Sequence, residues 1–341
     1  MSLFAAVLGC NNDPSPYYVV AEVRTPVLQL LQKASDTNTD PARKDCLTLD
    51  TGSSSAEGNS GTTEIWCQQY PVRPDAALLL KFVVMSPPGP DLTVSFDRLS
   101  RLAGLSSQLN SGGVARIGSS DNSNALPEDL TAYEISEVSA LRKTVLEEPL
   151  KVQEYYYSIK LPSAETLFSD FQTKGALPAY SLQYSVKAAA TVNHRSDQGF
   201  VSFYVFPDPQ SRVFQALLDG LLNRPAATDS ADQPPALSQD DIDRLKKQAT
   251  SNTPPEILSF TPNGGTLPAK AETRLEILLG PDNDDDARSR VLWFVNSGKL
   301  SNNKSKRPNW KPESSGKGAA FVMVRDLQGG SDYEIKTFDV E

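Results

Sequence analysis

Apolar and charged residues alternate along short segments in the last quarter of the chain. The pattern is clearest in residues 274–279 and 333–338. A period of two is typical of a strand with one buried face. Turn-forming residues separate these segments, as in residues 262–265 and 296–299. Several short strands at this spacing predict a β-sandwich over residues 251–341.

The first two hundred residues also carry β patterns, with longer apolar runs. Residues 78–84 are almost continuously apolar, which predicts a central strand covered on both faces. Residues 152–161 alternate and predict a long strand. Residues 180–192 and 200–206 predict a hairpin. We therefore expect a β-rich domain with a few helices over residues 17–210.

Ser163 is expected to cap a short helix that buries Leu167, Phe168 and Phe171. Helical spacing occurs in two other places. The first predicts a short helix from four residues: Phe96, Leu99, Leu102 and Leu105. The second is residues 211–250, where leucine pairs repeat along one amphipathic segment and Ser238 precedes another as a helix cap. The two amphipathic segments within residues 211–250 predict a helical connector between the domains.

The chain is thus predicted to be mainly β and to have four parts. Residues 1–16 form a short amino-terminal segment and tether. Residues 17–210 form the β-rich domain, residues 211–250 the helical connector, and residues 251–341 the sandwich. A length of 341 residues suits about two domains.

The last quarter carries a further set of landmarks. An acidic turn precedes Trp293, a W-x-P sequence follows at Trp310 and Pro312, and Asp326 begins the sequence D-L-Q-G-G. This order resembles the immunoglobulin-like and PKD-like modules of bacterial surface proteins. The resemblance implies that Trp293 lies in the core between two sheets and that the D-x-x-G-G turn joins the last two strands.

Two details of this module follow from strand geometry. Side chains alternate along a strand, so Leu292 and Phe294 should face away from the side of Trp293. Trp310 has polar neighbours and a nearby proline, so we expect it to be less buried than Trp293.

The acidic turn at residues 282–286 is the strongest candidate for metal chemistry. Clustered carboxylate oxygens suit Ca²⁺, and the candidate ligands are Asp282, Asp284, Asp286 and Asp326. The EF-hand glycine and distal glutamate are missing, and a solvated acidic turn is the alternative. No other cofactor is expected.

The charge balance restricts the partners. A net charge of −9 argues against nucleic acid, which binds clustered basic surfaces. The acidic composition also indicates no basic patch for anionic lipid. No apolar run reaches membrane-spanning length.

The amino terminus contains a candidate lipid anchor. Residues 7–10 read Val-Leu-Gly-Cys and resemble the lipobox of bacterial lipoproteins, in which the cysteine is lipidated. Residues 11–16 are polar and suit a tether. No basic residue precedes Cys10, so an ordinary short apolar terminus is the alternative. The resemblance implies a membrane partner and an envelope location, at the outer membrane or the cell surface.

The other two cysteines, Cys46 and Cys67, suit a disulfide. The segment between them is poor in apolar residues, and an oxidising compartment would allow the bridge. Two unpaired buried thiols are the alternative. No C-x-x-C sequence occurs, which argues against zinc and thioredoxin-type chemistry.

Catalytic motifs are hard to find in this sequence. The single histidine, His194, lies in a predicted hairpin turn, and no glycine-rich phosphate loop follows a strand. We therefore expect no enzyme, but an envelope lipoprotein that binds, spaces or assembles other surface proteins or glycans. One alternative is a secreted or periplasmic enzyme or ligand-binding protein with its site in residues 17–210. Another is an intracellular interaction protein with free thiols.

Overall fold

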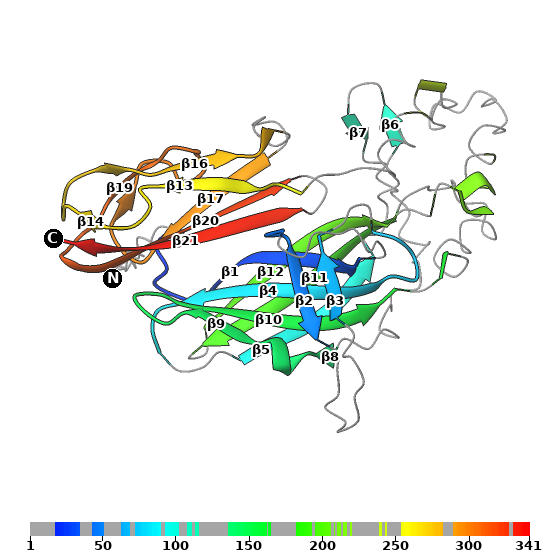
Figure 1. Cartoon of the computed structure of the whole chain (residues 1–341), viewed down its shortest axis with the longest axis horizontal. Coiled ribbons are helices and arrows are strands. Elements are labelled where there is room, and N and C mark those ends of the chain that lie inside the picture. The colour runs from blue at the N-terminus through cyan, green and yellow to red at the C-terminus, as the bar shows by residue number, and fades with distance from the viewer. Residues whose placement is uncertain are drawn as a thin grey trace, which may run out of the picture.

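The computed structural model shows a chain built almost entirely from β-strands (Figure 1). It describes residues 18–34, 43–50, 63–68, 72–89, 93–101, 108–110, 113–115, 136–161, 163–164, 182–192, 195–205, 254–281, 289–326 and 330–341, with scattered residues between 208 and 243. The mainly β class is therefore confirmed. None of the helices in these ranges is long and apolar enough to cross a membrane.

The amino-terminal half contains a seven-stranded sheet, called here the large sheet, in which all neighbours are antiparallel. Its order is β2 (Cys46–Asp50), β3 (Thr63–Cys67), β1 (Arg24–Lys33), β4 (Ala77–Ser86), β10 (Lys151–Lys160) and β8 (Ser136–Glu137), and β9 (Lys143–Leu146) also pairs with β10. A 3-10 turn, η2 (Ser139–Leu141), follows β8.

Strand β4 is central, as the apolar run at residues 78–84 predicted. It lies between β1 and β10, and every residue from Leu78 to Ser86 except Lys81 is buried. The long strand predicted at residues 152–161 is confirmed as β10. Both strands need apolar residues on two faces because other layers cover the sheet on both sides.

A three-stranded hairpin sheet lies beside β1. It consists of β12 (Arg195–Val205), β11 (Leu182–Val192) and β5 (Thr93–Arg101). The predicted hairpin is confirmed as β11 and β12, although β12 begins earlier than expected. A small separate hairpin joins β6 (Gln108–Asn110) to β7 (Gly113–Ala115).

The helix predicted around Phe96 and Leu99 is wrong, because this segment is strand β5. Ala188 of β11 pairs with Phe96 and Lys187 pairs with Arg98, so Asp97 is an extra, bulged residue. The bulge breaks the period of two and gives apolar positions a spacing that mimics a helix. Leu102 and Leu105 lie outside the described residues.

The carboxy-terminal part is a β-sandwich. One layer, called here the inner sheet, has the order β14 (Thr266–Leu267), β21 (Ser331–Val340), β20 (Gly316–Asp326) and β17 (Ser289–Val295). The facing layer has two pieces. One pairs β13 (Ile257–Thr261) with β16 (Glu276–Leu279), and the other has the order β15 (Thr273–Arg274), β19 (Asn309–Lys311) and β18 (Lys299–Leu300).

Aromatic side chains fill the space between these layers. The Trp293 ring meets Phe260 edge-on with centroids 5.1 Å apart, and Phe338 lies 6.4 Å from Phe260 and 5.7 Å from Trp310. Trp293 is 0% exposed, as predicted. The expectation for Trp310 is wrong, because it is also 0% exposed. Its polar neighbours belong to the opposite face of β19, and Gly318 leaves room for its ring, since a Cβ there would lie 2.8 Å from Trp310.

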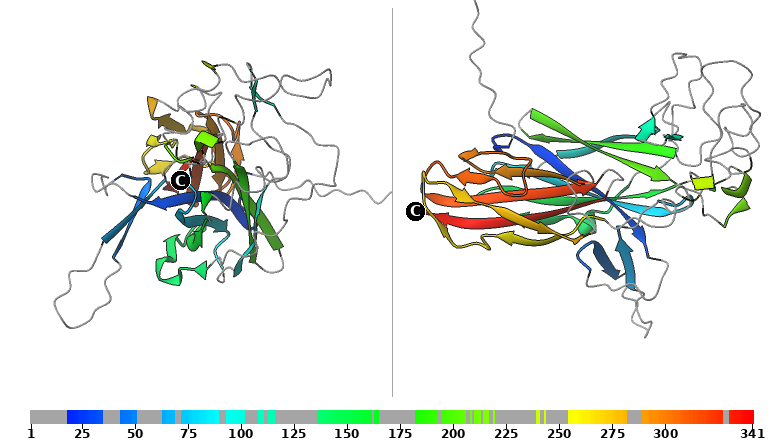
Figure 2. Two further views of the ribbon diagram at one scale, coloured as in Figure 1. Left: turned by 90° about the vertical axis from the view of Figure 1, so that its right-hand side faces the viewer. Right: turned by 90° about the horizontal axis from the view of Figure 1, so that it is seen from above.

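The inner sheet is covered on its second face as well. Leu292 and Phe294 lie opposite Trp293, as predicted, but Phe294 packs against the amino-terminal half instead of facing solvent. Figures 1 and 2 show β20 and β21 running alongside β1, β4 and β10 of the large sheet. The two halves of the chain therefore share one continuous stack of β layers.

The start of the described chain belongs to the sandwich. Val19 forms a parallel bridge with Val295 at the free edge of β17. The Val295 N–H donates to Tyr18 O at 2.8 Å, and the Val20 N–H donates to Val295 O at 2.9 Å. Tyr18 and Val19 also pack on the sandwich core. The first described residues therefore lie on the sandwich, and the chain enters the large sheet at Arg24.

The predicted helical connector is not supported, because too few of residues 211–250 are described to show a helix. The best-defined piece is a single turn in which the Phe214 N–H donates to Ser211 Oγ and the Gln215 N–H to Ser211 O. The connector and the predicted domain boundaries remain predictions.

Candidate functional site at the junction of two sheets

The contact between the inner sheet and the large sheet is called here the junction. Its first half is apolar. From the inner sheet, Phe294, Phe321 and Met323 are buried there, and from the large sheet the buried partners are Val27, Val83, Met85 and Val152. Burial of this many apolar side chains strongly favours the docked arrangement.

The second half of the junction is polar and centres on Glu154 of β10. Its Oε1 lies 2.8 Å from Lys81 Nζ and also accepts a hydrogen bond from the Tyr333 hydroxyl. The Tyr156 hydroxyl donates to Oε2 at 2.6 Å. Tyr333 comes from β21, so this carboxylate links the two halves of the chain directly.

Tyr333 is held between an aromatic ring and a cation. Its ring stacks on Phe321 with centroids 5.2 Å apart and planes 12° apart. On the large sheet, Lys81 Nζ lies 4.9 Å from the centroid of the same ring. The hydroxyl of Tyr333 reaches Glu154 beside that lysine, which fixes the angle between the two sheets.

The charge state of this cluster follows from its contacts. Burial raises the pKa of Glu154, but the Lys81 charge and the hydrogen bonds from Lys81, Tyr156 and Tyr333 together hold it below its usual value. Burial and the nearby Glu154 charge raise the pKa of both tyrosine hydroxyls. At neutral pH the carboxylate is therefore ionised and both of its oxygens accept hydrogen bonds, which suits a structural link better than a general base.

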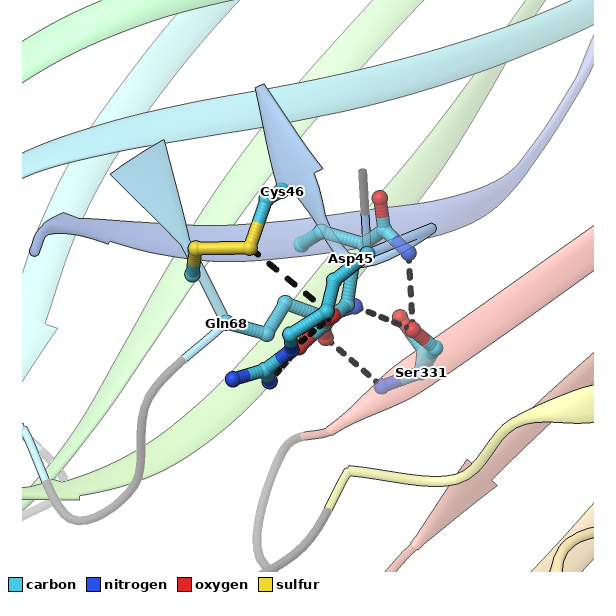
Figure 3. A network of polar contacts seen from close by, with 7 residues as sticks. Asp45, Cys46, Gln68 and Ser331 are labelled. Carbon is cyan, nitrogen blue, oxygen red and sulfur yellow. Dashed lines mark hydrogen bonds and ion pairs between the residues drawn. A yellow bond between two sulfur atoms is a disulfide. The ribbon is translucent and has the colours of Figure 1, made fainter. Parts of the chain in front are cut away.

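A second polar contact joins Gln68 to the start of β21 (Figure 3). The side-chain amide of Gln68 donates to Ser331 O at 2.6 Å, and Gln68 Oε1 accepts from the Ser331 N–H at 3.0 Å. Gln29 of β1 also donates to Ser331 O, at 2.7 Å. Gln68 thus pairs with the Ser331 backbone as a neighbouring strand would, although it is a side chain.

The disulfide lies next to this contact. Cys46 and Cys67 are directly opposite residues of β2 and β3, and their sulfurs are bonded. Gln68 follows Cys67, and its N–H donates to Asp45 O at 3.0 Å. Figure 3 shows the bridge beside Gln68 and Ser331. The disulfide therefore fixes the backbone from which Gln68 reaches the sandwich.

A third contact ties the segment before β2 to the sandwich. Lys44 Nζ donates to Ile257 O at 2.8 Å, and the Ile257 N–H donates to Asp332 Oδ2 at 2.7 Å. Burial raises the pKa of Asp332, while the hydrogen bonds from Ile257 and Tyr333 and the Lys44 charge act in the opposite direction. Asp332 adjoins both Ser331 and Tyr333, so the start of β21 makes two of the polar contacts of the junction and supports the third through Ile257.

The predicted metal site stays a prediction. Cys10 and residues 282–286 lie outside the described residues, as does His194. Asp326 Oδ1 accepts a hydrogen bond from the Gly330 N–H at 2.8 Å, which closes the turn between β20 and β21. No group of three or more candidate ligands occurs within the described ranges.

Sequence reasoning missed the residues that build the junction: Gln29, Gln68, Lys81, Glu154 and Tyr333. One signal was available, because Lys81 interrupts the apolar run of β4 and Glu154 lies on the neighbouring strand β10. A charged residue in such a strand needs a partner of opposite charge. The sequence does not reveal that the partner group also includes a tyrosine from the sandwich.

Comparisons with known proteins give distant structural likenesses only. No family model matches the chain, and no curated protein matches it. The Ig1-2 module of the Drosophila receptor protein tyrosine phosphatase DLAR aligns with 8% identity and a TM-score of 0.25, over 79% of this chain and 93% of that one. Cadherin domains 3-6 of protocadherin gamma B2 align with 12% identity and a TM-score of 0.20, over 87% and 69%.

A third likeness is to Drosophila N-cadherin EC1-3, with 9% identity, a TM-score of 0.22, and coverage of 63% of this chain and 56% of that one. These TM-scores are all below 0.5, so the likenesses carry no argument about function. The β-sandwich class rests instead on the strand pairings and the shared core described above.

Proposed function

We propose that this chain is a non-catalytic lipoprotein of a bacterial cell envelope, at the outer membrane or the cell surface, which acts in binding, spacing or assembly. Cys10 carries the lipid, and the β units hold other surface proteins or glycans at a fixed distance and angle. The observation that supports this most is the junction, where Phe294, Phe321 and Met323 bury the second face of the inner sheet.

A spacer must resist bending, and the junction supplies a reason why this one does. Rotation of the sandwich would expose the apolar patch and break the hydrogen bonds from Ser331 and Tyr333 to the large sheet. Each buried polar group left without a partner costs about 1–3 kcal/mol. The two halves should therefore move as one body.

Rigidity can be measured by the distance between two spin labels, one on each half. Ser136 of β8 and Thr337 of β21 are exposed and accept cysteine-linked labels in a Cys10→Ser background. A single narrow distance distribution is expected, like that of a control pair at Glu313 and Thr337 within the sandwich. A broad distribution for the first pair alone would show that the two halves move relative to each other, which contradicts a rigid spacer.

The lipid anchor needs its own test. Growth with a fatty-acid analogue should label the wild-type protein and leave Cys10→Ser unlabelled, and the variant should move from the membrane fraction to the soluble fraction. Equal labelling of both proteins, or labelling of neither, would refute the anchor. Cys46 and Cys67 serve as internal controls, because their sulfurs are bonded to each other and are not free to be acylated.

A further inference from the structure

We propose that the hairpin formed by β18 and β19, called here the basic hairpin (residues 296–312), binds the surface of an anionic phospholipid membrane. This inference deepens the proposed function, since it names the surface that the sandwich meets beside the lipid anchor. It places the sandwich against the membrane and the large sheet further out.

The charge of the basic hairpin differs from that of the whole chain. Residues 296–312 contain five lysines or arginines and no aspartate or glutamate, although the chain carries a net charge of −9. The three lysines that carry the proposal, Lys299, Lys304 and Lys311, are exposed. Averaging over the whole sequence conceals this local patch.

Two of these lysines are placed against each other. Lys299 and Lys311 are directly opposite partners on β18 and β19. Like charges at such positions destabilise a strand pair. A local arrangement that opposes stability, kept on an exposed surface, is expected where a ligand of opposite charge binds.

The basic hairpin is a rigid platform. Leu300 and Trp310 are also opposite partners, and both are buried beneath the lysines. Trp310 Nε1 donates to Ser297 O at 2.9 Å. Gly298 has a φ of +87°, and a Cβ there would lie 2.2 Å from Lys311 O, so the turn requires glycine. The backbones of Lys299 and Lys311 are therefore held in place, and their side chains are exposed.

Nearby carboxylates neutralise only part of the patch. Glu276 pairs with Arg307 at 2.7 Å and lies 3.9 Å from Arg274. Glu272 accepts from Asn309 Nδ2 at 3.0 Å, and Glu313 is exposed next to Pro312. Within the described part of the chain, no carboxylate lies within ion-pair distance of Lys299, Lys304 or Lys311.

The start of the described chain lies beside the basic hairpin. Tyr18 accepts from the Val295 N–H, and Asn303 of the hairpin accepts from the Trp293 N–H at 2.9 Å. These are consecutive rungs on one edge of β17, about 7 Å apart. Cys10 precedes Tyr18 by about eight residues, which span at most roughly 28 Å. A lipid on Cys10 would therefore hold Lys304 near the membrane surface.

This proximity favours a lipid surface over other polyanions. A lipid chain combined with a basic patch gives more stable membrane binding than either signal alone. Nucleic acid would meet the acidic remainder of the molecule as well as the patch, which disfavours it. An anionic membrane needs contact with one face only.

The test uses full-length Cys10→Ser protein, so that acylation plays no part. It is mixed with vesicles of phosphatidylcholine alone or with added phosphatidylglycerol, and the bound fraction is measured by sedimentation. We expect binding to the anionic vesicles that falls as salt is added. Each lysine near the surface contributes a factor of about five, so Lys299→Gln/Lys304→Gln/Lys311→Gln should bind roughly 100-fold more weakly.

A control variant has the same change in charge at the large sheet: Lys143→Gln/Lys151→Gln/Lys160→Gln. It should bind as Cys10→Ser does. The proposal is overturned if both triple variants bind equally, if neutral vesicles bind as well as anionic ones, or if the Cys10→Ser protein binds neither. Because acylation is tested separately by labelling, loss of the anchor and loss of the basic surface give different results.

Discussion

Trp293 and Phe294 are consecutive residues of β17, both 0% exposed, yet they lie in different cores. Trp293 packs between the two layers of the sandwich, and Phe294 packs against the large sheet. The inner sheet is therefore a wall shared by both halves of the chain. A substitution that disturbs packing on one face of the inner sheet should therefore also weaken packing on the other face, because the same strands form both faces.

The first prediction concerns the two buried tryptophans of the sandwich. Trp293→Ala and Trp310→Ala should each lower the free energy of unfolding by about 3–5 kcal/mol, since both remove a fully buried ring. Denaturant unfolding followed by circular dichroism measures both losses. A change much smaller for Trp310→Ala would contradict its burial.

The second prediction separates the side chain of Ser331 from its backbone. Gln68→Ala should cost about 1–3 kcal/mol, because it leaves the Ser331 N–H without the acceptor it has here. Ser331→Ala should be neutral or slightly stabilising, because Ser331 Oγ is buried without a hydrogen bond among the described residues. Equal losses in the two variants would show that the backbone contact is not what holds β21.

The third prediction is a pH dependence from Glu154. Its pKa in the folded protein lies below the usual 4.5, so its contribution is fully present above that value and is lost as the pH falls through the folded pKa. Glu154→Gln should remove this acid-limb contribution. It should also cost about 3–5 kcal/mol at neutral pH, because Lys81 is left without its carboxylate.

Two comparisons make that test specific. Asp332 has a raised pKa, so its effect on stability depends on pH in the opposite direction to that of Glu154. The stability that Asp332 contributes is present at low pH and is lost as the pH rises through its folded pKa. Asp332→Asn should therefore leave the acid limb due to Glu154 in place. Lys81→Met combined with Glu154→Gln should recover part of the loss, and no recovery would argue against an ion pair as the cause.

The fourth prediction concerns the disulfide. Mass mapping of alkylated thiols should find neither Cys46 nor Cys67 reactive in denatured, unreduced protein from its own compartment. Reduction should lower the free energy of unfolding by about 3 kcal/mol for this separation of 21 residues. Cys46→Ser/Cys67→Ser should match the reduced protein. Two reactive thiols would refute the bridge.

Strands with a clean pattern could be predicted from the sequence. The apolar run at β4 and the alternation at β10 gave the centre of the large sheet, and the alternation around Trp293 gave the two faces of β17. In each case the side-chain period of the strand is unbroken. The same rule places Trp310 in the core, because Asn309 and Lys311 on either side of it face the opposite way. The expectation that Trp310 is less buried took these polar neighbours as a sign of exposure instead.

The junction could not be predicted in the same way. Phe294 and Phe321 look like members of an ordinary sandwich core, and only the docked large sheet shows that they belong to a second one. Gln68 and Ser331 are far apart in the sequence, and the Gln68 side chain contacts the backbone of Ser331, which leaves no pattern of residue types. The basic hairpin was visible in residues 296–312, but whole-chain charge hid it.

The bridge between Val19 and Val295 has a consequence for the order of events during synthesis. Translation produces Val19 well before Val295, so Val19 must wait for its partner on β17 until the residues between them have been made. Contacts this distant in sequence slow folding. Docking of Val19 on the edge of β17 is therefore expected to be a late step of folding.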